Sequence, residues 1–402
     1  QGTTFQPDNA VQAYNYRLCL TNNPSNKTTV QKPANYNRSE YVSLIEDVFT
    51  GRNTQVDMMQ VTSEMMDKNR MLILKGQPTQ LPGDVWGIHK ITNMVSVPNS
   101  KTDANNQHRA FISTDLPEEN WPWPTASWEW RDRYAQRLKE YTLGLIWFAQ
   151  NDAELPSHFR KEALKWGLAK DEYADNGNFP RQVYVREGRR FEGLHFFTAK
   201  DAVPVSAGSR PPVYANSITA SHYALDSHAV LKREKGRIHL DGFLSYPTAV
   251  YTVPYGVIVP KSVDNLLLPV PVSGSHIGFS TLRMEPCWMA MGQAAGIAAS
   301  VAIDKDVKVR NVDINLLQTE LLQQHATLIY YKDVLPDNPH FTLVQAMGLR
   351  GYLPDWEARL NDPVDAETIK QWSLLAGRKL SVGAGETTRV KLLTEIFEML
   401  KH

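Results

Sequence analysis

The chain has 402 residues, of which 42% are hydrophobic, and its 43 basic and 43 acidic residues give a formal net charge of zero. This length can bury a large core and form two or three domains, while a balanced charge gives no long-range field to attract nucleic acid or an anionic membrane. Two cysteines, Cys19 and Cys287, are too few for a disulfide framework or a zinc site. We find no run of about 18 apolar residues, so the sequence predicts no membrane span.

The first half of the chain is predicted to combine helices and a mixed or antiparallel sheet with one long loop. Glu40 to Phe49 shows helical spacing. Trp128 to Gln150 is the clearest helix, because apolar residues recur every three or four positions, and Ser127 is its expected N-cap. A second helix, Ser157 to Trp166, follows. Gly76 to Asn106 is rich in proline, glycine and asparagine, which predicts a long loop of the kind that is often functional.

Strands are predicted from alternating or wholly apolar runs that are bounded by turns. Alternation predicts short strands at Met94 to Val97, Gln182 to Arg186, Gly193 to Thr198, Ile238 to Leu244 and Thr248 to Val253. Tyr255 to Val259 and Leu266 to Val270 are short and apolar throughout, which is typical of strands buried on both faces. Ile218 to Val230 fits either a strand or a helix.

The stretch around residue 275 is the most informative. Gly274 to Ser280 is predicted as a loop of small residues, and a helix from about Glu285 to Ile303 follows it. Pro286 suits the first turn of this helix, where its missing N–H is not needed. The many glycines and alanines of the helix form a small face, against which a sheet or another helix can pack closely. Residues 326–402 are predicted to form a small helical module.

Several strings of unusual composition follow one another along the chain. They are Lys75-Gly76-Gln77-Pro78, Leu81-Pro82-Gly83-Asp84, Gly87-Ile88-His89-Lys90, Asp115-Leu116-Pro117-Glu118-Glu119, Phe179-Pro180-Arg181, the run from Ala220 to His228, and Val253-Pro254-Tyr255-Gly256. Together they resemble the FAD-dependent oxidoreductase family whose members are often labelled xanthan lyases. Leu266 to Ile303 is similar to the closing segment of that family, and the resemblance covers roughly residues 10 to 325.

The resemblance implies a glutathione-reductase-like protein of the mixed α/β (α+β) class that binds FAD. It implies a substrate domain over residues 1–235, the returning C-terminal part of an FAD-binding domain over residues 236–325, and the helical module over residues 326–402. In the family, an N-terminal strand–turn–helix with a glycine fingerprint binds the pyrophosphate, but this sequence contains no G-x-G-x-x-G. Because the chain also begins with Gln1, we expect a missing N-terminal segment or a partner chain to complete the FAD site.

The resemblance places the flavin ring against the small-residue stretch. The residues expected to bind the cofactor are Gly274, Ser275, His276, Gly278, Ser280, Thr281, Leu282 and Arg283. A reduced flavin carries negative charge at one ring edge, and a helix N-terminus near Pro286, the amides of Gly278 to Leu282 and the guanidinium of Arg283 would all favour that charge. The alternative is an ordinary glycine–serine loop that caps a buried helix.

A second candidate site lies in the run from His222 to His228. If this run is a strand, His222, Asp226 and His228 share one face, and an imidazole oriented by a carboxylate transfers protons well near pH 7. Oxidation by flavin needs such a base, so these three are the predicted catalytic residues. A structural hydrogen-bonded cluster and a metal site are the alternatives, and we predict no metal.

The polar run in the long loop is the third candidate. Asp103, Asn105 and His108 are predicted to bind a polyhydroxylated substrate such as a sugar, and a solvated loop is the alternative. Cys287, in the first turn of the predicted helix, is either a reactive thiol, because a helix dipole lowers a thiol pKa, or a buried and inert one.

These observations predict an FAD-dependent oxidoreductase that oxidises a small polar, carbohydrate-derived molecule by hydride transfer to flavin. The family label keeps a polysaccharide lyase as an alternative. A non-catalytic glycan-binding module is a further alternative, because Trp121, Trp123, Trp128 and Trp130 cluster within ten residues.

Overall fold

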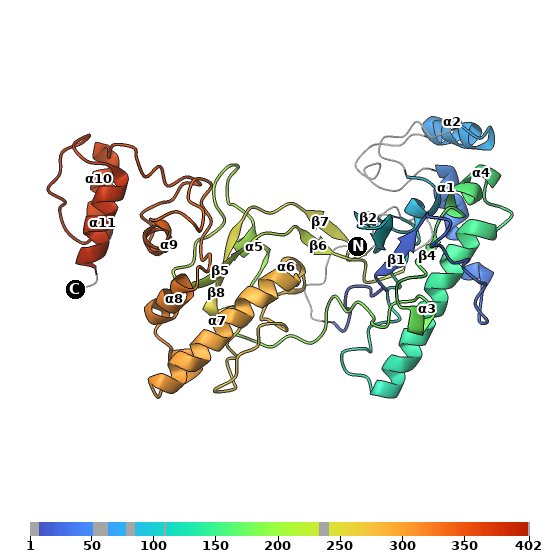
Figure 1. Cartoon of the computed structure of the whole chain (residues 1–402), viewed down its shortest axis with the longest axis horizontal. Coiled ribbons are helices and arrows are strands. Elements are labelled where there is room, and N and C mark those ends of the chain that lie inside the picture. The colour runs from blue at the N-terminus through green and yellow to red at the C-terminus, as the bar shows by residue number, and fades with distance from the viewer. Residues whose placement is uncertain (1–7, 51–62, 78–84, 108–109, 233–240, 401–402) are drawn as a thin grey trace. The chain divides into compact units, whose positions relative to one another are not determined.

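The computed structural model of the chain describes all residues except 1–7, 51–62, 78–84, 108–109, 233–240 and 401–402 (Figure 1). By packing, the chain divides into two compact units. The first unit contains residues 1–188 and 228–243, and the second contains residues 189–227 and 244–402. Both combine helices with small antiparallel sheets, so the expected mixed α/β class is confirmed.

The first unit is built on a four-stranded antiparallel sheet in the order β2-β3-β1-β4. Its strands are β1 (Leu18–Thr21), β2 (Met94–Val97), β3 (Lys101–Ala104) and β4 (Gly167–Leu168). Its helices are α1 (Ser43–Thr50), α2 (Ser63–Leu74), α3 (Trp128–Asn151) and α4 (Ser157–Ala163), with short 3-10 turns η1 (Arg38–Glu40), η3 (Gly87–Lys90) and η4 (Ala174–Asn176). The strand predicted at Met94 to Val97 is therefore confirmed.

Helix α3 forms where its sequence predicts it. The Ser127 side chain accepts a hydrogen bond from the backbone N–H of Trp130, as an N-cap does. The apolar positions Tyr134, Leu138 and Leu145 are buried in the core of the first unit. Gly144 lets the Tyr41 ring lie directly on the helix, because a Cβ at this position would overlap the Tyr41 hydroxyl.

The tryptophan cluster contributes mainly to the same core. Trp121, Trp123 and Trp130 are partly buried and pack against it. Trp128 is 72% exposed, and the Arg131 guanidinium lies over its ring, 4.7 Å from the centroid. Three of the four rings are therefore used in packing, and one is presented to solvent.

The second unit contains two small sheets and most of the remaining helices. Strand β5 (Ser217–Ser221) pairs with β8 (Tyr251–Pro254), and β6 (Leu225–Ser227) pairs with β7 (Leu244–Tyr246). The other elements are α5 (Ala199–Ala202), η5 (Tyr255–Val257), α6 (His276–Leu282), α7 (Glu285–Asp304), η6 (Val309–Asn311), α8 (Ile314–Gln323), α9 (Phe341–Leu349), α10 (Ala366–Leu375) and α11 (Arg389–Met399). Helix α7 packs against β5 and α8.

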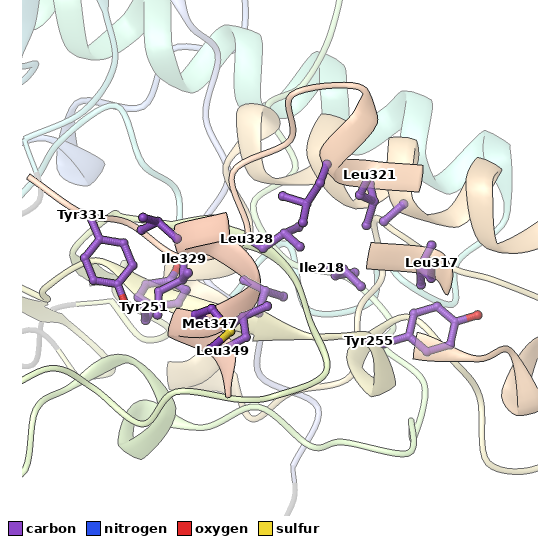
Figure 2. Packing of buried hydrophobic residues seen from close by; sticks show 14 of the residues in the cluster. Ile218, Tyr251, Tyr255, Leu317, Leu321, Leu328, Ile329, Tyr331, Met347 and Leu349 are labelled. Carbon is purple, nitrogen blue, oxygen red and sulfur yellow. The ribbon is translucent and has the colours of Figure 1, made fainter. Parts of the chain in front are cut away.

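One continuous core runs from β5 into the C-terminal helices. Figure 2 shows Ile218 of β5 and Leu321 of α8 in the same cluster as Met347 of α9. Buried Gln345 of α9 accepts hydrogen bonds from the N–H groups of Leu328 and Ile329, which ties α9 to the preceding segment. The division by packing thus differs from the three predicted domains: residues 326–402 share the core of residues 189–227 and 244–325.

Several predicted strands do not form. Gly193 to Thr198 makes only isolated bridges, at Gly193 and at Phe197, and Gln182 to Arg186 makes one, at Tyr184. Tyr255 to Val259 is buried but begins with the turn η5. Leu266 to Val270 is not a strand, and Leu266 and Val270 are 38% and 46% exposed, so the expectation of burial on both faces is wrong. Apolar composition alone did not distinguish a buried strand from an exposed extended segment. Most of Ile238 to Leu244 lies outside the described residues.

Within the described part of the chain, α7 is the one helix that is long and apolar enough to cross a membrane, and 33% of its apolar window is buried. The core helix of a soluble protein can pass the same test, so a single helix of this kind is weak evidence. The absence of a membrane span stays a prediction.

Candidate functional site

The stretch predicted as a small-residue loop is in fact the helix α6. Ser275 is its N-cap, and the Ser275 hydroxyl accepts a hydrogen bond of 3.0 Å from the N–H of Gly278. The N–H of Phe279 donates to the carbonyl of Ser275 at 2.8 Å. These amides are therefore used within the helix and its cap, and the expectation that the amides of Gly278 to Leu282 contact a ring edge is not supported.

The glycines of this stretch allow close backbone packing. Gly274 forms a parallel bridge with Phe197, and the N–H of Ser275 donates to the Phe197 carbonyl at 2.9 Å. A Cβ at Gly278 would overlap the same carbonyl, so only glycine fits there. The small residues thus seat α6 on the segment around Phe197.

The C-terminal half of α6 and the residue after it hold the segment that contains Asp226. The Arg283 Nη2 donates to the Asp226 carbonyl at 2.9 Å and to its Oδ2 at 3.1 Å. The Ser280 hydroxyl accepts from the N–H of Asp226 at 3.1 Å. Two sets of residues that the sequence assigned separately, to cofactor and to catalysis, are therefore in direct contact.

Two further contacts fix the same segment. The Thr281 hydroxyl donates to the Tyr223 carbonyl at 2.6 Å, and the Tyr251 hydroxyl lies 2.8 Å from the Thr281 hydroxyl. The Ser227 hydroxyl lies 2.8 Å from Nε2 of His276. Leu282, in contrast, is fully buried in the apolar core.

The junction between α6 and α7 contains a buried cation, Arg283, which is paired with Asp226, and the acidic residue Glu285 in the first turn of α7. The Arg283 side chain is 3% exposed, and its Nε is buried without a hydrogen-bond partner in the part of the chain that the structure describes. Met284, the N-cap of α7, provides no side-chain cap, and Pro286 lies in the first turn as predicted. The positive end of a twenty-residue helix and a buried guanidinium thus meet at one place.

The three predicted catalytic residues do not share a strand face. Strand β6 contains Asp226, but it begins after His222 and ends before His228. His222 is exposed, and its Nε2 lies 3.3 Å from the Thr248 carbonyl. His228 belongs to the first unit, whereas His222 and Asp226 belong to the second.

His228 is held by a buried carboxylate of the first unit. It is 2% exposed, and its Nδ1 lies 2.7 Å from Oδ2 of Asp115. A carboxylate at this distance accepts a hydrogen bond from Nδ1–H, and the tautomer with its proton on Nδ1 has its lone pair on Nε2. The side-chain nitrogen of Asn106 lies 3.2 Å from the same Nδ1. The backbone N–H of His228 donates to Oε1 of Gln12 at 3.1 Å.

Asp115 also belongs to a buried polar network. Arg186, 2% exposed, lies 3.0 Å from Asp115 through Nη1 and donates from Nη2 to Oδ1 of Asn105 at 2.9 Å. The Asn15 side chain donates to the same Asn105 oxygen at 2.8 Å. Charges this deeply buried are tolerated when they are paired and hydrogen-bonded, as here. Sequence reasoning did not single out Asp115 or Arg186 as site residues, although Asp115 opens one of the family-like strings.

The predicted substrate-binding residues have different surroundings. Asn105 is partly buried, and its side-chain oxygen accepts hydrogen bonds from Asn15 and Arg186, so it is tied to the network and its role towards a substrate stays a prediction. Asp103, on β3, is half-exposed and pairs with Nε of Arg17 at 2.9 Å. His108 lies outside the described residues.

Cys287 is 5% exposed, and burial raises the pKa of its thiol to about 11. The buried, inert alternative is therefore supported, and the helix dipole does not prevail over desolvation. Among the described residues, no group of three histidine, cysteine, aspartate or glutamate side chains could hold a metal ion.

The sequence matches the model of one protein family over residues 3–321, and that family is described as FAD dependent oxidoreductase. No curated protein matches the chain. No solved structure matches it either.

Proposed function

The chain belongs to the FAD dependent oxidoreductase family, and from this premise we propose that it oxidises a hydroxyl or amino group of a small molecule by hydride transfer to flavin. The family match, which spans about four-fifths of the chain, implies FAD binding. A carbohydrate-derived substrate is the class that the sequence favours. The observation that carries the proposal is the buried guanidinium of Arg283 at the start of α7.

The residues at the α6–α7 junction fit the electron-rich edge of a flavin ring, whereas the amides of α6 do not. The unpartnered Arg283 Nε and the uncapped start of α7 both favour negative charge. FAD, when bound, would supply the two-electron acceptor. Asp226 positions Arg283 through two hydrogen bonds, so the cation is held in place before any ligand arrives.

His228 is the residue that we propose as the base. Removal of hydride from a carbon that bears a hydroxyl or amino group also releases a proton. Asp115 fixes the His228 tautomer that carries its lone pair on Nε2, and it would stabilise the imidazolium after proton uptake. Arg186 lies 3.0 Å from Asp115, so the carboxylate that holds His228 is itself paired with a buried guanidinium.

We further propose that the pyrophosphate half of the FAD site comes from a strand–turn–helix segment, within the same protein or from a partner chain. Two surfaces of the second unit suit such a segment. On α7, a Cβ at Gly292 or at Gly296 would meet nothing within 4 Å, and Met289 is 75% exposed. The apolar side chains of Leu266 and Val270 are also exposed. A sheet laid against these surfaces would bury them.

The test uses protein expressed from its complete gene, with FAD binding followed by flavin absorbance and the reduction potential measured. We expect Arg283→Gln to weaken FAD binding about tenfold and to lower the potential, because one charge-assisted interaction with the reduced ring is lost. Arg283→Lys, which keeps the positive charge, should have a reduction potential close to that of the wild type. Arg378→Gln, at an exposed position, is the control.

In the same preparation, His228→Gln should slow flavin reduction by about a hundredfold and leave FAD affinity unchanged. Wild-type protein that binds no FAD would contradict the proposed function as a whole. An unchanged potential in Arg283→Gln would contradict only the assignment of Arg283, and an unchanged rate in His228→Gln would contradict only the proposed base.

A further inference from the structure

The first unit contains a cavity of about 490 Å³ that none of the predicted site residues lines. It lies among the start of α1, the segment of residues 110–117, and α3. Its walls are mainly apolar: Val42, Phe111, Ile112, Leu116 and Tyr141 line it. A volume of this size suits a small organic molecule, and apolar walls with few polar groups are typical of such sites.

Buried polar contacts hold the cavity open. Oδ2 of Asp47 accepts a hydrogen bond of 3.0 Å from the N–H of Phe111, and Asp47 is itself fully buried beside Lys90. At the other end of the segment, the Tyr141 hydroxyl donates to the Ser113 carbonyl at 2.8 Å. Because both anchors are buried, residues 110–117 cannot move into the cavity without losing them. The site is therefore preformed.

The charged groups around the cavity are mostly acidic. Among the described residues, Glu40, Glu46 and Asp115 line it together with the cation Lys232. Arg137 pairs with Glu40, and Arg186 lies 3.0 Å from Asp115, so both of these carboxylates have cationic partners. The Lys232 ammonium lies 2.6 Å from a carboxylate oxygen of Glu119, which offsets its charge. Carboxylates accept hydrogen bonds and repel anions, so the lining favours a neutral or cationic ligand that carries a donor. It disfavours a carboxylate-bearing ligand such as a uronate.

We propose that this cavity binds a molecule with an apolar, ring-sized body and one hydroxyl or amino group that faces the carboxylates of the lining, Glu46 among them. Asp115 lines the cavity and is also the partner of His228, so the cavity and the proposed base share one carboxylate. As a description of the substrate, this inference rests on the proposed function. It replaces the polyhydroxylated sugar with an amphipathic alcohol or amine, because a polyol would lose its hydration against apolar walls.

Binding is measured by isothermal titration calorimetry on the full chain without flavin. The probes are 2-phenylethanol and 2-phenylethylamine, with phenylacetate as the anionic counterpart and glucose as the polyol. We expect the alcohol and the amine to bind with dissociation constants on the order of 1 mM, which is typical of ligands of this size. Phenylacetate and glucose should bind at least about tenfold more weakly.

Two variants locate the binding. Val42→Trp fills the mouth of the cavity from a position that is 41% exposed, so the fold should tolerate it, and it should weaken binding of both ligands about tenfold or more. Val205→Trp, at a position 94% exposed in the second unit, should leave binding unchanged. Glu46→Gln should reduce the affinity for the amine relative to that for the alcohol.

The outcomes separate this inference from the proposed function. Binding of the alcohol and the amine that Val42→Trp weakens, in a protein that never reduces flavin, would support the cavity and contradict the oxidoreductase proposal. Flavin reduction by glucose without binding of phenylethanol would support the oxidoreductase proposal and contradict the inference about the cavity. Equal binding of phenylacetate, or binding unaffected by Val42→Trp, would overturn the inference about the cavity.

Discussion

At the scale of single residues, carboxylates carry most of the local organisation. Asp201 and Asp226 each accept hydrogen bonds from more than one residue, and Asp115 is hydrogen-bonded to His228 and ion-paired with Arg186. Asp201 shows this outside the candidate site. Its Oδ1 lies 3.0 Å from Nε2 of His195, and its Oδ2 accepts hydrogen bonds of 2.7 Å from the N–H and the hydroxyl of Thr198. This cluster secures the segment around Phe197 on which α6 rests.

Asp201 also predicts an acid-sensitive contribution to stability. Burial raises the pKa of its carboxyl, but hydrogen bonds from His195, Tyr214 and Thr198 outweigh burial and bring the pKa from 3.8 down to about 2. Since the folded-state pKa lies below the unfolded value, the contribution is complete above about pH 5 and is lost as the pH falls towards 2. It amounts to about 2 kcal/mol. Urea unfolding should therefore show that the difference in unfolding free energy between wild type and Asp201→Asn becomes smaller as the pH falls from 6 to 2.5. Asp337→Asn, at an exposed position, is the control, and a constant difference for Asp201→Asn would contradict the assignment.

Residue patterns in the sequence revealed some side chains of the candidate site and missed others. His228 and Asn105 lie in dense polar runs of the sequence, and both belong to one hydrogen-bonded network, in which His228 is buried and Asn105 is partly buried. Asp115 and Arg186 were missed as site residues because the network joins segments more than seventy residues apart, and no local spacing records such a contact. The proposed roles of these residues stay predictions.

At the scale of elements, helices were more predictable than strands. Helix α3 has a serine cap and a long apolar period, which are local signals. Helix α6 was mistaken for a loop because it is seven residues long, rich in small side chains, and made stable by its contacts with Phe197. Leu266 to Val270 has the composition of a buried strand, but the side chains of Leu266 and Val270 are exposed. Composition shows that the segment could be buried in a sheet, but it does not show whether a neighbouring strand is present.

Two helical glycines give a matched prediction about these elements. Gly278→Ala should destabilise the second unit by about 1–3 kcal/mol, because its methyl group would overlap the Phe197 carbonyl and α6 would have to shift. Gly296→Ala should stabilise the chain by about 0.5–1 kcal/mol, because alanine favours a helix interior and nothing lies within 4 Å of its Cβ. Urea unfolding of both variants measures the difference. Equal effects would contradict the packing of α6 described here, and weaker FAD binding by Gly296→Ala in the complete protein would support a segment packed on α7.

At the scale of the whole molecule, two hydrophobic cores divide the chain. One core joins β1 to α3, and the other extends from β5 to α11. The chain passes from the second unit to the first at His228 and returns at Leu244, so the segment that carries the predicted catalytic residues is also a connection between the units. Changes in one core should therefore have little direct effect on packing in the other.

This division predicts that the units unfold in separable steps, and each contains one cysteine that reports on it. Cys19 lies on β1 of the first unit, and Cys287 lies in α7 of the second, with the pKa of both thiols raised mainly by burial. Labelling by a thiol reagent during a urea titration should therefore follow each unit independently, because unfolding exposes its thiol. Asp115→Asn removes one partner of a buried ion pair, so it should lower the free energy of unfolding of the first unit by about 3 kcal/mol. The urea midpoint reported by Cys19 should therefore fall, and the midpoint reported by Cys287 should change little. Gly278→Ala should lower the midpoint reported by Cys287 and leave the midpoint reported by Cys19 nearly unchanged. If each substitution shifted both midpoints equally, the two units would unfold as one cooperative body, and the separation of the cores would have no thermodynamic counterpart.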